Sequence, residues 1–185
     1  MQRYDLESRV AERMESDERL LWAGRPPQGF VLRPIDWFFV PFSLVWGGFA
    51  IFWEAAALAS GAPLFFAIWG VPFVLVGLYF IGGRFVVDSR LRARTAYAVT
   101  NQRIIILSGA TGQRMTSVGL HTLTEIHVET RPDGSGTLRF GRLPIWGAMP
   151  SGWPGSARLQ VPEFERIPDV QSVYNAIREA QRASV

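Results

Sequence analysis

A run of arginines is the densest group of side chains in this sequence that could do chemistry. Arg84, Arg90, Arg92 and Arg94 lie close together, opposed only by Asp88. Such a cluster attracts phosphate groups, either of anionic lipids or of nucleic acids. No recognised nucleic-acid-binding motif accompanies it. We therefore interpret the cluster as a lipid-headgroup site, as a signal of membrane topology, or as both.

Other chemistries find little support in the residue types. The chain has no cysteine, which excludes a disulfide framework, a zinc ribbon, an iron–sulfur cluster and thiol catalysis. It also has no lysine, which excludes Schiff-base chemistry and a Walker-type phosphate loop. His121 and His127, with Glu125 and Glu129 nearby, are too few for a metal site. We expect no metal, cofactor, catalytic residue or small-molecule substrate, no nucleic acid, and a protein that is not an enzyme.

The hydrophobic residues are concentrated between positions 37 and 83, where Glu54 is the only charged side chain. Two apolar runs, 37–53 and 62–83, would span about 26 and 33 Å as helices, against about 30 Å for a bilayer core. The first run needs flanking residues to complete the crossing. Neither run has the polar stripe of a soluble helix. Residues 35–83 are therefore predicted to form two transmembrane helices.

The predicted helices must form an antiparallel hairpin, because the turn at residues 59–63 is short. Basic residues flank the hairpin on both sides, while the turn has none. The positive-inside rule then places both termini in the cytoplasm. Trp37 and Trp53 suit interfacial anchors near the two ends of the first helix.

Small residues inside the hairpin point to close helix packing. Gly70 and Gly77 are seven positions apart and share a helix face, and Gly47 and Gly48 lie on the other helix. They pack either against each other or against another membrane subunit. Glu54 is a functional hypothesis as an intramembrane carboxylate, or a solvated interface residue near the outer turn.

The remaining segments are predicted to lie in the cytoplasm. Residues 1–25 are helical in pattern, with Leu6, Val10 and Met14 as a narrow apolar stripe suited to docking, and 22–34 read as irregular. Strand patterns and a closing helix from Pro168 follow the hairpin, and indicate an antiparallel barrel or sandwich. The expected strands are 95–100, 103–107, 115–120, 123–131, 137–142 and 157–164. We divide the chain into 1–34, 35–83 and 84–185.

The loop at 143–156 is unusual, because it places large apolar side chains among glycine and proline. They are Ile145, Trp146, Met149 and Trp153. Such a loop folds back on the domain, dips into the lipid interface, or binds another protein. If the cytoplasmic part has a partner site, these four side chains are the candidates for it.

Several stretches resemble the bacterial PH-like domain proteins that carry a membrane-helix hairpin ahead of the domain. They are ERLLWAGRPP, TAYAVTNQRIIILSG, SVGLHTLTEIHV, DGSGTLRFG and FERIPDVQSVYNAI, of which the block from Tyr97 to Gly109 is the strongest. The resemblance implies a membrane α+β protein with a PH-like split β-barrel capped by a C-terminal helix, and no shared catalytic residues. Animal relatives bind phosphoinositides through basic residues in the first hairpin loop, but here residues 108–113 contain none.

Two functional hypotheses follow. The first is a membrane-anchored interaction module, an accessory or assembly subunit of a larger complex, whose partners are the bilayer and a membrane-protein complex or a second copy. The second is recognition of anionic lipid headgroups at the cytoplasmic face. Both place the protein in a bacterial inner membrane.

Overall fold

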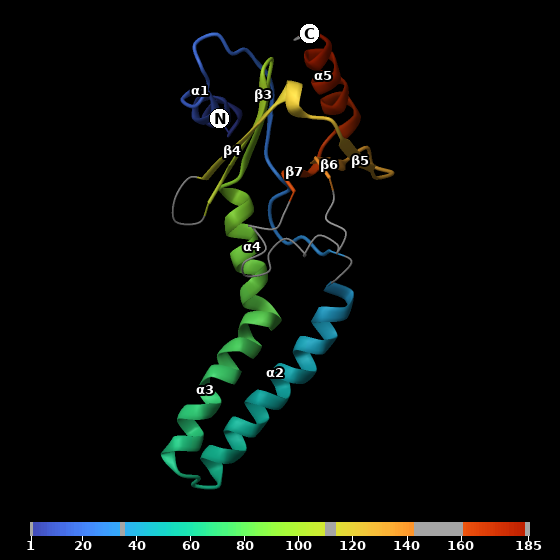
Figure 1. Ribbon diagram of the computed structural model, residues 1–185. Coiled ribbons are helices and arrows are strands. Elements are labelled where there is room, and N and C mark those ends of the chain that lie inside the picture. Colours follow the sequence, from blue (N-terminus) through green and yellow to red (C-terminus); the bar gives the residue numbers. More distant parts are fainter. Residues whose placement is uncertain (1, 34–35, 110–113, 143–160, 184–185) are drawn as a thin grey trace. The chain divides into compact units, whose positions relative to one another are not determined.

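The computed structural model describes residues 2–33, 36–109, 114–142 and 161–183, and its elements are labelled in Figure 1. Contacts divide the chain into two compact units. We call residues 30–89 the hairpin unit and residues 1–29 with 90–185 the sheet unit. The sequence analysis predicts three consecutive segments, 1–34, 35–83 and 84–185. The grouping differs because the first segment packs on strands that come much later in the chain.

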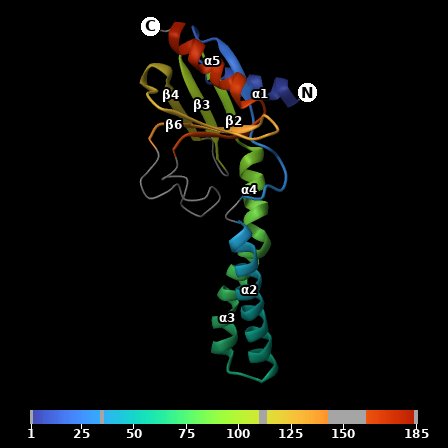
Figure 2. The same ribbon diagram turned by 90° about the vertical axis from the view of Figure 1, so that its right-hand side faces the viewer.

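The hairpin unit is built on two antiparallel helical arms that lie side by side in Figures 1 and 2. The first arm is α2, Asp36–Ala59. The second begins with α3, Leu64–Leu78, continues through a π-helical turn, η1, Tyr79–Gly83, and leads into α4, Arg84–Ala93. Both arms are long and apolar enough to cross a membrane, judged by length and composition alone.

Glycines form the contact between α2 and α3. A Cβ placed on Gly77 would lie 2.9 Å from the Cα of Gly47, so the two backbones almost touch there. Gly70 leaves room for the Glu54 carboxylate, which lies where a Cβ would otherwise be. Gly48 differs, since nothing lies within 4 Å of a Cβ built on it. Gly47, Gly70 and Gly77 therefore face the other arm, and Gly48 faces away from it.

Two antiparallel sheets and two helices make up the described part of the sheet unit. The first sheet has the order β1-β2-β3-β4, and the second has the order β5-β6-β7. The strands are β1 Leu20–Gly24, β2 Ala96–Thr100, β3 Arg103–Ser108, β4 Arg114–Gly119, β5 Ile126–Thr130, β6 Gly136–Phe140 and β7 Glu163–Ile167. The helices are α1, Gln2–Ala11, and α5, Val170–Ala183, and a short 3-10 helix, η2, spans Leu120–Thr122.

The main hydrophobic core lies between the two sheets and α5. Tyr97 of β2, Phe164 of β7 and Ile177 of α5 are all buried in it. The rings of Tyr97 and Phe164 stack with centroids 4.7 Å apart. The helix contributes its apolar stripe because Val170, Val173, Ile177 and Ala180 recur at helical spacing.

A second, smaller core lies on the opposite face of the first sheet. Leu6 and Val10 of α1 pack against Ala98 of β2 and against Ile105 and Leu107 of β3. Strand β2 is therefore buried along its whole length, since α1 covers the face that the main core does not. The narrow stripe predicted for residues 1–25 docks here.

The structure departs from the expected elements in three places. Residues 20–24 form strand β1 where a helical pattern was predicted, and residues 84–93 form helix α4, for which no element was predicted. The strand predicted at 157–164 begins at Glu163 among the described residues. The remaining expected strands overlap β2 to β6.

The glycine contact predicts a specific difference between two substitutions. Gly77→Ala puts a methyl group against helix backbone, which has to shift, so we expect a loss of about 1–3 kcal/mol. Gly48→Ala adds a methyl group in open space, so its effect should stay within about 1 kcal/mol and can be favourable through helix propensity. Unfolding of the full chain in detergent micelles measures both, and equal losses for the two variants would contradict the contact.

Candidate functional site

The four clustered arginines differ in their burial and in the unit to which they belong. Arg84 lies in the hairpin unit, while Arg90, Arg92 and Arg94 belong to the sheet unit. Arg90 and Arg94 are exposed, but Arg92 is 5% exposed. Half of the predicted basic cluster is therefore turned toward the protein itself.

Arg92 holds the chain segment that approaches the hairpin unit. Its guanidinium donates to the backbone oxygens of Pro27, at 2.5 Å, and Gly29, at 2.7 Å. The Gln28 side chain in turn donates to the backbone oxygen of Arg92, at 3.3 Å. A buried arginine with two carbonyl acceptors is satisfied by its own chain, so Arg92 acts as a backbone anchor.

Arg84 belongs to a group of four charged side chains, Arg33, Asp36, Arg84 and Asp88, which we call the base cluster. An Nη1–Oδ1 distance of 2.8 Å joins Arg84 to Asp36, and an Nη2–Oδ1 distance of 3.1 Å joins Arg33 to Asp88. The backbone N–H of Arg33 also donates to Asp36, at 2.7 Å. All four side chains are at most 17% exposed. Each arginine of the base cluster is thus paired with an aspartate, next to the start of α2 and within α4.

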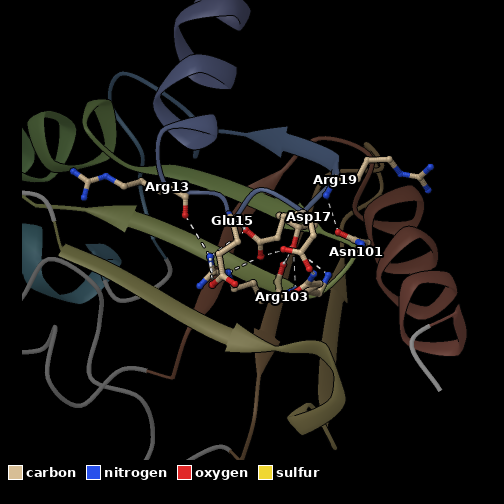
Figure 3. A network of polar contacts seen from close by, with 9 residues as sticks. Arg13, Glu15, Asp17, Arg19, Asn101 and Arg103 are labelled. Carbon is tan, nitrogen blue, oxygen red and sulfur yellow. Dashed lines mark hydrogen bonds and ion pairs between the residues drawn. The ribbon is translucent and has the colours of Figure 1, made fainter.

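A second polar network, shown in Figure 3, is centred on Arg103. Its guanidinium makes a two-point contact with Glu18, with N–O distances of 2.6 and 3.0 Å. It also reaches Glu15 at 3.2 Å and the backbone oxygen of Arg13 at 3.3 Å. The Glu18 side chain is fully buried, so this pair is shielded from solvent.

The turn between β2 and β3 extends the same network. Asn101 exchanges two hydrogen bonds with the backbone of Arg19, and Gln102 donates to Asp17 at 2.7 Å. The Thr100 hydroxyl accepts from the backbone N–H groups of Gln102 and Arg103. We call the network between residues 13–19 and 100–103 the polar clasp. The residues that carry the strongest resemblance thus fasten the N-terminal segment to the first sheet.

Burial and hydrogen bonding act in opposite directions on Glu18. Burial by itself raises the pKa of the carboxyl group, but hydrogen bonds from Arg103 and the backbone, with the Arg103 charge, outweigh it and lower the pKa. The pKa of Arg103 is raised by the same contact. Both groups therefore stay charged at neutral pH.

A third charged group lies on the outer face of the second sheet. Arg139 of β6 bridges Glu129 of β5 and Glu163 of β7, and its hydrogen bond to Glu129 raises its pKa. Glu125 accepts from Arg142 at 3.4 Å and lies 3.8 Å from His127. These contacts tie three strands together.

The remaining predicted sites are separated or lie outside the description. His121 is in η2 and His127 is in β5, and among the described residues no cluster of histidines and carboxylates could hold a metal ion. Ile145, Trp146, Met149 and Trp153 lie outside the described residues. The sequence reasoning missed Asp36 and Glu18, whose partners are distant in the chain, so no local spacing marks them.

Residues 42–181 match a family model described as a bacterial PH domain. The match includes residues of both the hairpin unit and the sheet unit. No curated protein and no solved structure matches the chain.

The polar clasp predicts a pH dependence of stability. Because the folded pKa of Glu18 is lowered, its contribution is complete above its unfolded pKa of about 4.3 and is lost as the pH falls through the folded value. Glu18→Gln should cost about 1–3 kcal/mol at pH 7, and the loss should shrink below pH 4. Urea unfolding of the full chain at several pH values tests this, with Glu12→Gln, an exposed change, as the control. A constant difference between wild type and Glu18→Gln at all pH values would contradict the assignment.

Proposed function

Because the chain belongs to the bacterial PH domain family, we propose that it is a membrane-tethered binding module that holds a protein partner at the cytoplasmic face of a bacterial inner membrane. PH-like domains are in general binding modules without catalytic activity. A fold alone does not identify the ligand, so the choice of a protein partner has to be supported by the chain's own residues.

One observation supports a membrane position of the hairpin unit. The two hydrophobic clusters of the sheet unit are built from residues of that unit. Among the described residues, the exposed large apolar side chains are concentrated in the hairpin unit, where Trp37 is 90% and Val45 is 76% exposed. The sheet unit therefore has a core of its own, and the apolar surface of the arms needs another cover. A lipid bilayer supplies such a cover.

The distribution of arginines supports the orientation. Arg33 precedes the first arm and Arg84 follows the apolar part of the second, α3 with η1, whereas the turn between the arms has no basic residue. Two antiparallel helices return the chain to its starting side. Both flanks, and with them the sheet unit, then belong to the cytoplasm by the positive-inside rule.

The internal use of the arginines favours a protein partner over a lipid headgroup. Arg92 is engaged with backbone oxygens, and Arg84 with Asp36. A headgroup site on the sheet unit is left with Arg90 and Arg94, since Arg84 belongs to the hairpin unit. The apolar side chains of the 143–156 loop are the partner surface that we propose, and an accessory or assembly role in a membrane complex follows from a tethered module of this kind.

Co-purification of the full chain from native membranes in mild detergent tests this function. We expect the same companion protein in independent preparations, and we expect Trp146→Ala with Trp153→Ala to reduce its recovery. Arg90→Gln with Arg94→Gln is the matched control and should leave recovery unchanged. Recovery of the chain alone, without a reproducible companion, would contradict the proposal.

Headgroup recognition is the second candidate, because Arg90 and Arg94 are exposed. If they bind anionic lipid, phosphatidylglycerol should be enriched around the reconstituted full chain, at about 1 kcal/mol per arginine. The enrichment should fall with salt and in Arg90→Gln with Arg94→Gln. If the enrichment of phosphatidylglycerol depends neither on salt nor on these two substitutions, headgroup recognition by Arg90 and Arg94 is excluded.

A further inference from the structure

We propose that Arg84 binds the phosphate group of a membrane phospholipid through the Nε–Nη2 edge of its guanidinium. This inference rests on the proposed membrane position of the hairpin unit. It concerns residues 30–89 alone, and so differs from a headgroup site on the sheet unit.

The Arg84 side chain is fixed from two directions. Its Nη1 atom lies 2.8 Å from Oδ1 of Asp36. Its Cζ atom lies 4.4 Å from the centre of the Phe85 ring, which covers one face of the guanidinium. These two contacts set the plane of the group, and with it the direction of the opposite edge.

That opposite edge has no acceptor in the part of the chain that the structure describes. The Nε and Nη2 atoms of Arg84 are buried, and neither has a hydrogen-bond partner among the described residues. A buried donor without an acceptor costs about 1–3 kcal/mol, and more when the group is charged. An acceptor supplied to this edge would therefore be bound favourably.

The nearby carboxylates are already engaged. Asp36 accepts from Arg84 Nη1 and from the backbone N–H of Arg33, while Asp88 accepts from Arg33. The Nε and Nη2 hydrogens point the same way, and this edge of a guanidinium fits two oxygens of one carboxylate or phosphate. The missing acceptor is thus an anion with paired oxygens from outside the described chain.

The surroundings of Arg84 favour a phosphate that carries acyl chains. The Phe30 ring stacks on the Phe85 ring with centroids 5.1 Å apart. Phe30 is 73% exposed. Leu32 is also exposed, at 64%, as are Val86 and Val87 of α4. A buried phosphate-binding edge in a unit whose exposed surface is largely apolar matches a phospholipid, whose headgroup phosphate lies next to its hydrocarbon.

Burial of the two nitrogens has a kinetic consequence. The phosphate reaches them only when the neighbouring side chains move apart, so exchange should be slow. We expect a lipid that stays bound through purification, unlike the lipids that exchange freely around the arms.

Native mass spectrometry of the full chain in detergent tests the proposal. Arg84→Lys is the decisive variant, because lysine keeps the positive charge for Asp36 but lacks the paired donors. We expect retained phosphatidylglycerol to fall about tenfold, which corresponds to about 1.4 kcal/mol. Arg90→Lys, an exposed change in the same helix, is the matched control and should retain lipid as the wild type does.

Two further measurements on the wild-type protein keep the test decisive if Arg84→Lys does not fold. Diacylglycerol with the same acyl chains lacks the phosphate, so it should neither bind nor displace phosphatidylglycerol. Displacement by millimolar inorganic phosphate would assign the site to free phosphate instead of lipid.

The proposal is overturned if Arg84→Lys retains lipid as the wild type does, or if diacylglycerol binds equally well. Recovery of the companion protein should be unchanged in Arg84→Lys. Failure of the lipid site and failure of the proposed function are therefore seen in separate measurements.

Discussion

The constraint on which the structure depends is the apolar surface of the two helical arms. Residues 37–83 contain one charged side chain, and the large apolar side chains of α2 and α3 are mostly exposed. In the proposed lipid environment there is no hydrophobic driving force between the two helices, so close backbone packing has to hold them together. Gly47 against Gly77 provides that packing. The charges gather where the apolar arms end, and the base cluster pairs them there.

The sheet unit meets the opposite requirement, since it buries its apolar residues itself. Its main core joins both sheets to α5, and α1 covers the remaining face of the first sheet. The polar clasp fastens this arrangement, because Arg103 holds the segment that follows α1. In the proposed function, this self-contained unit binds the partner, and the hairpin unit needs to supply only its location.

Composition and periodicity predict the elements whose signal is local. The apolar arms, the β2–β3 pair around Asn101, and the helix that carries Val173 and Ile177 all follow from the sequence alone. Strand β1 does not, because five residues become a strand only through pairing with β2. The ion-pair partners of the arginines are equally distant in the sequence. Arg84 meets Asp36 and Arg103 meets Glu18 across long stretches of chain, so local spacing does not predict which arginines are paired within the chain itself.

Labelling of single cysteines by a membrane-impermeant maleimide tests the membrane-tethered account most directly. The chain has no cysteine of its own, so each introduced thiol reports one position. Ser60→Cys, at the end of the first arm, and Ser172→Cys, on the exposed side of α5, lie in the two regions concerned. In intact spheroplasts we expect Ser60→Cys to be labelled at once and Ser172→Cys only after the membrane is opened. Labelling of both before opening, or of neither, contradicts a hairpin that crosses the membrane and leaves the sheet unit inside.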